Sequence, residues 1–290
     1  MNNNYFRSVT RFVALLLLCA TGLVAPSYAQ NPFAGLGALN NNLPAISYTL
    51  NITQPGTYTL ARDIRVASGD GIVITASGVT LDLDGHHVTT GAPGTGRGIA
   101  IVGATGVEVK NGRVGGFMMT VLLMNSVNTS VSNLRITGAG LAPNNGPTEL
   151  GVVVLNSRGA FITRNIITNV NLGLFVRGSG STGNRISENT LVGGAIPANN
   201  LLGICYNPAP GADGAIDGPS GDVIYNNHIA RFGYAIAVSA ASVSNIFREN
   251  TLSSFVGGIR EPTRFVGGGG TNIADGNLET TIAASVLANQ

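Results

Sequence analysis

One short motif recurs along this chain of 290 residues, and its recurrence limits the fold more than any other feature. The motif is an apolar residue, a polar stretch containing Asn or a substitute, and a second apolar residue. Most closing apolar residues follow one another after 22 to 26 positions, and longer intervals contain insertions. Self-similarity at such a period is typical of repeat architectures. The eight copies read LDGHHV (83–88), VKNGRV (109–114), VSNLRI (131–136), ITRNII (162–167), ISENTL (186–191), IYNNHI (224–229), FRENTL (247–252) and IADGNL (273–278).

A second pattern keeps a steady offset from the first, with Gly or Ala followed by apolar-x-apolar. Each period therefore holds two or three strand-length segments and has no room for a helix. The 41 Gly and 30 Asn agree, because both residues are poor helix formers. The sequence predicts an all-β parallel solenoid of about eight coils. The pattern reads GIVI (71–74), GIAI (98–101), GVVV (151–154), GLFV (173–176), GICY (203–206) and AIAV (235–238).

Asparagine recurs at fixed positions within the repeat. Asn165, Asn189, Asn227 and Asn250 share one position, and Asn111 and Asn133 precede it by one residue. Asn stacked at a turn can pass amide hydrogen bonds from coil to coil and tolerates a left-handed backbone. We expect these asparagines to be structural.

The first 29 residues have the pattern of a cleavable signal peptide. Arg7 and Arg11 precede an apolar run, and Ser27-Tyr28-Ala29 supplies the small-x-small cleavage site. We therefore expect a secreted or periplasmic bacterial protein, with no other apolar run long enough to span a bilayer. The expected division is signal peptide 1–29, N-terminal linker or cap 30–45, solenoid 46–279 and C-terminal tail 280–290.

Cleavage would leave a mature chain with 14 basic and 14 acidic residues, formally neutral. This balance argues against a nucleic-acid partner, which requires a clustered Lys/Arg surface. Cys205 would be the single mature cysteine, so no internal disulfide is expected. We interpret Cys205 as a small buried apolar residue.

Together with the repeats, the segment GVTLDLDGHHV (78–88) resembles the right-handed parallel β-helix proteins of the pectin-lyase-like superfamily. The preceding ITQPGTYTLARDI (52–64) is similar to the opening of secreted bacterial β-helix proteins related to the nitrous-oxide accessory protein NosD. The resemblance implies a single-stranded right-handed β-helix. It leaves the function open, because this fold hosts lyases, hydrolases, epimerases and non-enzymes.

In pectin hydrolases of this superfamily, catalytic carboxylates stand just before the G-apolar-x-apolar strand. Along the positions just before this strand, the next acid near Asp70 is Glu149, three coils away or about 14 Å by coil spacing. This distance is too large for a hydrolytic pair. The resemblance therefore does not extend to the pectin-hydrolase mechanism. The equivalent positions here are Asp70, Arg97, Thr120, Leu150, Leu172, Leu202 and Tyr234.

Asp70 and Arg97 have two interpretations. We favour an ion pair between adjacent coils. The alternative follows from the resemblance to lyases of the superfamily, in which an Arg abstracts a proton beside a carboxylate-bound cation. No acid cluster surrounds Asp70 to support Ca²⁺ binding, and no cofactor is evident.

Asp82, Asp84, His86 and His87 form the densest group of ionisable residues. Asp84 and His87 are a candidate acid–base set, and the group could also bind an acidic sugar or a metal. We expect Glu108 beside Asp82 and Lys110 beside Asp84 on the next coil. We also expect His87 to begin a column that continues with Arg113 and Arg135. The favoured interpretation is a solvated face with stacked opposite charges.

Two insertions, 139–149 and 193–222, leave the repeat at equivalent points and should lie on one side of the solenoid. They predict a candidate substrate-binding surface, with surface loops of no such role as the alternative. Asp222 also lies at the end of the second insertion. The candidate substrate-binding residues are Glu149, Tyr206, Asp213, Asp217, His228 and Arg231.

The sheet built from the second pattern should be apolar on its outer face as well. Residues 31–45, a loop or a second chain could cover it, and we favour cover from within the chain. Self-association through the region of Phe175 and Cys205 is the alternative. The expected outer positions are Val73, Ala100, Leu122, Val153, Phe175, Cys205 and Ala237.

Two functions remain open from the sequence. One is a secreted β-helix that binds or processes a polysaccharide or surface glycan along its side, lyase- or epimerase-like rather than pectin-hydrolase-like. The other is a non-catalytic extracellular or periplasmic scaffold or adhesion solenoid.

Overall fold

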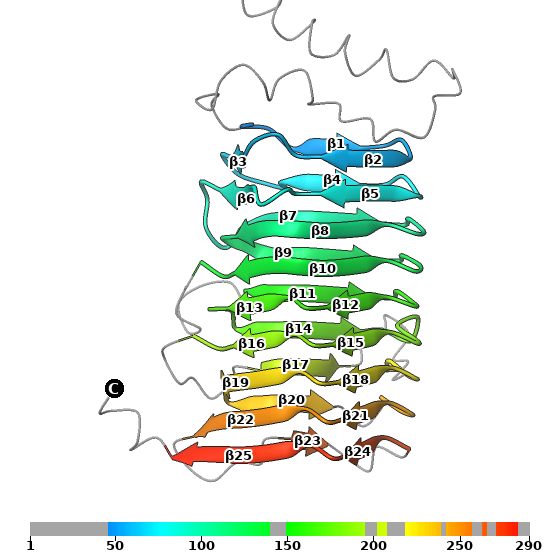
Figure 1. Cartoon of the computed structure of the whole chain (residues 1–290), viewed down its shortest axis with the longest axis vertical. Helices are drawn as coiled ribbons and strands as arrows, with labels where there is room; N and C mark the ends of the chain where they lie inside the picture. Colours follow the sequence, from blue (N-terminus) through cyan, green and yellow to red (C-terminus); the bar gives the residue numbers. More distant parts are fainter. Residues whose placement is uncertain are drawn as a thin grey trace, which may run out of the picture.

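The computed structural model describes residues 46–139, 149–194, 202–207, 218–238, 242–256, 263–265 and 271–283. Within these ranges every regular element is a β-strand, and the strands stack into a rod of successive coils (Figure 1). No helix in the described part of the chain is long and apolar enough to cross a bilayer. The signal peptide expected at 1–29 and the linker or cap expected at 30–45 lie outside the described residues.

One sheet takes a single strand from each coil, and its neighbouring strands are all parallel. Among the described residues it has nine strands. In spatial order they are β1 (Leu50–Ile52), β4 (Ile72–Ile74), β7 (Thr95–Val102), β9 (Phe117–Met124), β11 (Leu150–Leu155), β14 (Leu172–Arg177), β17 (Leu202–Asn207), β20 (Tyr234–Val238) and β23 (Thr263–Phe265).

The other sheet takes the remaining strands, which lie in two rows along the rod. The first row holds β2 (Gly56–Thr59), β5 (Val79–Asp82), β12 (Phe161–Thr163), β15 (Arg185–Ser187), β18 (Val223–Tyr225), β21 (Ile246–Arg248) and β24 (Ile273–Asp275). The second row holds β3 (Ile64–Val66), β6 (His87–Thr90), β13 (Ile166–Thr168), β16 (Thr190–Val192), β19 (His228–Phe232), β22 (Thr251–Val256) and β25 (Leu278–Ala283). The long strands β8 (Glu108–Gly115) and β10 (Ser130–Thr137) run through both rows.

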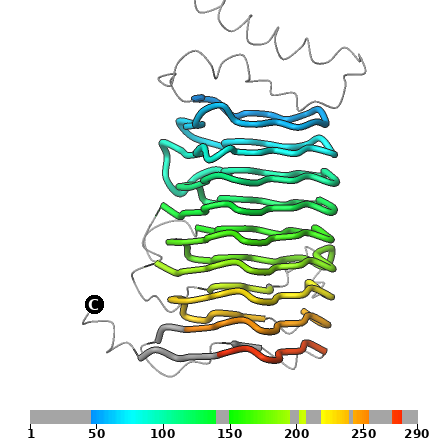
Figure 2. Tube along the Cα trace, in the orientation of Figure 1, coloured from blue at the N-terminus to red at the C-terminus, as the bar shows by residue number. Residues whose placement is uncertain are grey.

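The expected all-β parallel β-helix is confirmed, with the coils lying one above the next (Figure 2). The nine-stranded sheet has one strand more than the eight motif copies. Ile64 pairs with Val88, so residues 60–64 occupy the motif position of a preceding coil. At the other end β25 continues to Ala283, past the boundary expected at residue 279.

The core of the rod is filled by the apolar residues that the repeat places inward. Seven of the eight closing residues are at most 1% exposed, whereas Leu278 in the last described coil is 65% exposed. The residues that flank each closing residue within its strand point outward, because successive side chains of a strand face opposite sides. The buried closing residues are Val88, Val114, Ile136, Ile167, Leu191, Ile229 and Leu252.

The Gly of the second pattern is required by close approach between coils. A Cβ on Gly173 would lie 2.6 Å from the carbonyl oxygen of Gly203 and 2.7 Å from Leu191. A Cβ on Gly203 would lie 2.4 Å from the carbonyl oxygen of Ala235. Real Cβ atoms do not approach backbone this closely, so the pattern marks where adjacent coils pack too closely for a side chain.

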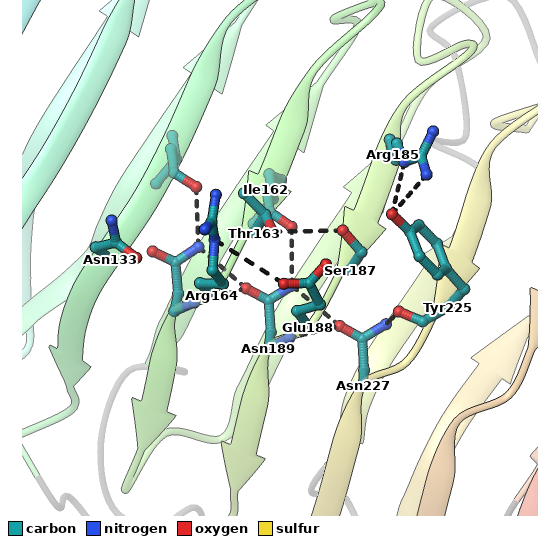
Figure 3. Close-up of polar contacts among 12 residues, drawn as sticks. Asn133, Ile162, Thr163, Arg164, Arg185, Ser187, Glu188, Asn189, Tyr225 and Asn227 are labelled. Carbon is teal, nitrogen blue, oxygen red and sulfur yellow. Dashed lines mark hydrogen bonds and ion pairs between the residues drawn. The ribbon is translucent and has the colours of Figure 1, made fainter.

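The main asparagine column is confirmed. The backbone N–H and the side-chain amide of Asn165 both donate to Oδ1 of Asn189, at 2.9 and 3.0 Å. Asn189 donates in the same way to Asn227, and the sequence continues through Asn250 and Asn277. Each side-chain amide also reaches a backbone carbonyl, for example that of Ile162 from Asn189 at 2.8 Å (Figure 3). The asparagines therefore replace backbone partners at a turn where the ladder breaks.

The two earlier asparagines occupy the left-handed position next to this column. Asn111 and Asn133 have φ of 60° and 54°, as expected. The N–H of Leu134, one residue after Asn133, donates to Oδ1 of Asn165 at 3.0 Å. The asparagine column thus begins where the chain changes from continuous strands to strands split by a turn.

Candidate functional site

Asp70, just before β4, and Arg97, in β7, form the expected ion pair. Nε and Nη2 of Arg97 both donate to the carboxylate, and so does the Arg97 backbone N–H at 2.9 Å. The hydrogen bonds from Arg97 lower the pKa of Asp70, and the same contact raises the pKa of Arg97. Both groups are therefore charged at neutral pH, which supports the structural ion pair rather than Arg97 as a proton-abstracting base.

The column expected to contain Asp70 and Arg97 has a different third member. Arg97 pairs with Met119, and Met119 pairs with Leu150. Thr120 instead follows Met119 at the position that Gly occupies in other coils, where its carbonyl oxygen lies 2.5 Å from a Cβ built on Gly98. The prediction of Thr120 was wrong because this coil lacks the Gly that marks the register.

The two histidines near residue 85 contact Asp63, which the sequence analysis did not include. His86 Nδ1 lies 3.2 Å from Oδ1 of Asp63, and the backbone N–H of His87 donates to the same oxygen at 2.9 Å. Partial burial raises the pKa of Asp63, but the bonds and charges of His87 and His86 outweigh it, and the net shift is downward. No hydrogen bond joins the side chains of Asp84 and His87 in the described chain.

Glu108 and Lys110 do not pair with the residues expected of them, because each lies opposite the preceding outward residue. Lys110 pairs with Asp82, and Glu108 pairs with Thr80, so Lys110 is not beside Asp84. The coil containing Asp84 has two more residues between its rows than the next coil, because His87 pairs with Arg113. The expected column of His87, Arg113 and Arg135 is confirmed by the pairing of Arg135 with Arg113.

The first insertion is anchored by Glu149, which is 1% exposed. Its Oε1 accepts the N–H of Ala139 at 3.0 Å, on the far side of the insertion. Its own N–H donates to Oδ1 of Asn171 at 2.8 Å. The Glu149 carboxylate therefore bridges the base of the insertion and is buried, so it is not part of the exposed surface.

Tyr206 lies in the core at 1% exposure, so it does not line the surface expected of it. Its hydroxyl donates to Oδ2 of Asp222 at 2.9 Å. Asp222 is also fully buried, and both the N–H and the side-chain amide of Asn184 donate to it. Burial raises the pKa of Asp222 to about 6 despite these bonds. Burial and the Asp222 charge raise the pKa of Tyr206.

The other candidate residues of the second insertion are separated. Asp213 and Asp217 lie outside the described residues. His228 is exposed in β19, where it pairs with Thr190 and Thr251. Arg231 is exposed with φ of 63°, at an irregularity in the pairing of β19 with β22.

A cluster that sequence reasoning missed stands on the outer face of the first row. Tyr225 receives hydrogen bonds from Nε and Nη2 of Arg185, one coil away, at 2.9 and 2.6 Å (Figure 3). The Arg185 guanidinium carbon lies 4.6 Å from the centre of the Tyr225 ring, and that of Arg248, on the following coil, lies 5.8 Å away. Hydrogen bonds from Ser187 and Arg185 lower the pKa of Tyr225.

Further side chains extend this cluster, and we call Phe161, Arg185, Tyr225 and Arg248 the Arg–Tyr face. Phe161 precedes Arg185 by one coil and is 49% exposed. Arg164 and Glu188 form an exposed ion pair of 3.9 Å beside it (Figure 3). Alternation alone marks Arg185, Tyr225 and Arg248 as outward residues, but only the coil-to-coil register brings them together.

The outer face of the nine-stranded sheet is apolar, and the expected column from Val73 to Ala237 is confirmed by the pairing. Leu122 and Val153 are each 4% exposed, and Cys205 is 6% exposed. Burial raises the pKa of the Cys205 thiol to about 12, which confirms that it is a buried apolar residue. Phe175 is half-buried against this apolar group.

Within the described ranges, no group of three or more His, Cys, Asp or Glu side chains is placed to hold a metal ion. The candidate residues therefore form separate sites, and the outer face of the two-row sheet carries the exposed ones.

Comparison with known proteins identifies a shared fold. The DFA-IIIase of Arthrobacter chlorophenolicus A6, in complex with GF2, matches with a TM-score of 0.60 at 12% identity. The match covers 81% of this chain and 58% of that one. The Dettilon tailspike protein gp208 matches with a TM-score of 0.50 at 14% identity, over 80% of this chain and 60% of its own.

This chain therefore spans less than two thirds of either protein, and at these identities the likeness concerns the parallel β-helix alone. No protein-family model matches the sequence. The search of curated proteins finds no match either.

Proposed function

We propose that this protein is an exported β-helix that binds a polysaccharide along its side, on the Arg–Tyr face. The observation that carries the proposal is Tyr225, an outward aromatic residue flanked by the guanidinium groups of Arg185 and Arg248. These residue types dominate binding energy at interfaces, because each offers both apolar area and strong donors. The signal-peptide pattern at residues 1–29 supports export.

The chemistry of the face suits a sugar chain. The exposed ring of Phe161 can stack against the C–H face of a sugar, while the guanidinium donors reach hydroxyl or carboxylate oxygens. Successive coils rise by about 4.8 Å, close to the length of one pyranose unit. A polysaccharide lying along the rod would therefore meet equivalent positions on successive coils.

Binding is favoured over processing by the described residues. Asp70 and Arg97 neutralise each other, Glu149 closes an insertion, and Asp84 does not bond to His87. General acid–base chemistry needs a proton-transferring group within reach of the substrate. The Arg–Tyr face instead supplies donors and rings. The DFA-IIIase, with the same fold, was crystallised in complex with GF2.

A glycan array followed by titration of the best ligand tests the proposal. Tyr225→Ala and the double variant Arg185→Ala/Arg248→Ala should each raise Kd by about tenfold or more, since truncating a central aromatic or Arg residue has an effect of this size. Arg158→Ala is the matched control, because Arg158 is an exposed arginine in a turn outside the face.

Reducing-end and unsaturated-sugar assays on bound polymers separate binding from turnover. We expect binding without product. Unchanged affinity in the Tyr225 variant would contradict the Arg–Tyr face, and a product would restore the lyase- or epimerase-like interpretation.

A further inference from the structure

A column of basic side chains crosses three successive coils on the second row of the two-row sheet. His87 in β6 pairs with Arg113 in β8, and Arg113 pairs with Arg135 in β10. All three alternate with fully buried neighbours such as Val88, Val114 and Ile136, so their side chains point outward. Arg113 and Arg135 are both exposed. We call these three residues the basic column.

Glu108 and Asp82 of these coils have partners outside the basic column, whereas Asp63 lies opposite its His87 end on the preceding coil. Glu108 forms an ion pair with Lys110 at 2.9 Å, and Asp63 binds His86 and the N–H of His87. Asp82 accepts hydrogen bonds from the Asn111 amide and the N–H of Asp84. Within the described ranges neither Arg113 nor Arg135 forms an ion pair or a side-chain hydrogen bond.

This arrangement is unfavourable for the isolated protein. Like charges directly opposite on neighbouring strands repel one another, and sheets usually place opposite charges there. The backbones of Arg113 and Arg135 lie about 4.8 Å apart, the spacing of neighbouring strands. No described carboxylate lies between the two residues. Arg164, in contrast, is an outward arginine with an acid partner, Glu188. An anionic ligand would remove the repulsion and supply the missing partners.

We propose that the basic column is a second binding site, for a polysaccharide carrying carboxylate or sulfate groups along its length. The planar guanidinium groups of Arg113 and Arg135 can each donate two hydrogen bonds to such a group. Their axial spacing matches anionic groups on adjacent sugars of one polymer. The site shares no residue with the Arg–Tyr face, so either assignment can fail without the other.

Binding to immobilised polyuronate, a sulfated glycan, neutral dextran and duplex DNA, each at several salt concentrations, tests the site. The wild type should bind the two anionic glycans, more weakly as salt rises, and should not bind dextran. Arg113→Ala/Arg135→Ala should lose about tenfold or more in affinity. Tyr225→Ala should retain this binding, and Arg158→Ala controls for the loss of one positive charge.

A charge reversal adds a second readout, the Tm, which is measured without any ligand. Arg135→Glu places a carboxylate opposite Arg113, so it should raise Tm while abolishing binding to anionic glycans. A merely destabilising substitution would lower both. The relative response to polyuronate and sulfated glycan identifies the anionic group.

Several results would overturn the proposal. They are no binding of either anionic glycan by the wild type, equal binding by the double variant, or an equal loss in Arg158→Ala. Binding of DNA as tight as that of the glycans, through the same arginines, would assign the column to nucleic acid instead.

Discussion

Asp222 belongs to a second column of stacked side chains, distinct from the main asparagine column. Its other members are Asn184, Asn245 and Asn272. Asn184 donates to Asp222, Asp222 donates its N–H to Asn245, and Asn245 donates to Asn272. The exception has a cause in the core. Tyr206 occupies an inward position that is Val176 and Val238 on the adjacent coils, and its buried hydroxyl needs an acceptor. The polar Tyr206 in the core is thus matched by the acceptor Asp222 in the second column.

The Asp222 carboxyl should make stability depend on pH. Its folded pKa of about 6 lies above the ordinary 3.8, so its contribution is present at low pH and lost as pH rises through about 6. From about pH 5 to about pH 7, the wild-type free energy of unfolding should fall by about 1 kcal/mol more than that of Asp222→Asn. Denaturant unfolding at both pH values measures this difference, with Asp84→Asn as an exposed control. Parallel pH dependence in wild type and Asp222→Asn would refute it.

Sequence reasoning could have placed Tyr206 correctly. The register of GICY that puts Cys205 on the outer face also puts Ile204 and Tyr206 inside, as the structure confirms. The error came from counting Tyr206 within the insertion at 193–222, although residues 202–207 form β17. Asp222 was harder, because the insertion before it hides its alignment with Asn184 and Asn245.

Among the elements, the split strands of the two-row sheet depend on the main asparagine column. β12 and β13 are separated only by Arg164 and Asn165, and Arg164 has φ of 57°. The turn leaves backbone groups without strand partners, and the Asn side chains bond to them. Each member serves the coil before and the coil after it, so one substitution affects two turns.

Removing one member of the main asparagine column should therefore lower the free energy of unfolding substantially. Asn189→Ala deletes the acceptor for both donors of the buried Asn165 and the donor to the Ile162 carbonyl. We expect a loss of about 2–4 kcal/mol, since buried polar groups lose their partners. Thr190→Ala, at the next and outward position, is the control and should change stability little. Chemical denaturation compares them, and similar midpoints for both variants would contradict the structural role.

The two binding faces are harder to predict from the sequence than the turns. The Arg–Tyr face joins Arg185, Tyr225 and Arg248 from three coils, and an insertion lengthens the chain between the first two. No local motif marks them, because each contributes one outward side chain to an ordinary strand. The basic column was predicted, since its three residues each directly precede the closing apolar residue of the motif, and the two extra residues near Asp84 lie before His87.

For the whole molecule, the sequence could predict the fold because most coils repeat the same requirements. Inward apolar residues, close-packed Gly and turn Asn recur together, and only stacked parallel coils satisfy all three. Function has no such repetition. A binding surface on a solenoid uses whichever outward residues adjacent coils bring together, so it leaves no periodic signal.

Protection along the rod should be graded. The last described coil exposes Ile273 by 54% and Leu278 by 65%, whereas the long strands β8 and β10 lie between neighbours on both sides. In repeat proteins each coil contacts only its neighbours, so terminal coils open locally at lower free energy. Native-state hydrogen exchange should show faster exchange in 273–283 than in 108–137. Equal protection of the two segments would indicate a single cooperative unit.

The asparagine column also gives the rod a direction. Every backbone N–H in it points toward the following coil and every Oδ1 toward the preceding one, so each coil presents an acceptor edge on one side and a donor edge on the other. Removing one entire coil would bring together two edges that are again complementary, whereas removing part of one would not. Length in this architecture is thus adjustable in steps of one coil, which gives an inherited duplication or deletion of a whole coil a route to a folded protein.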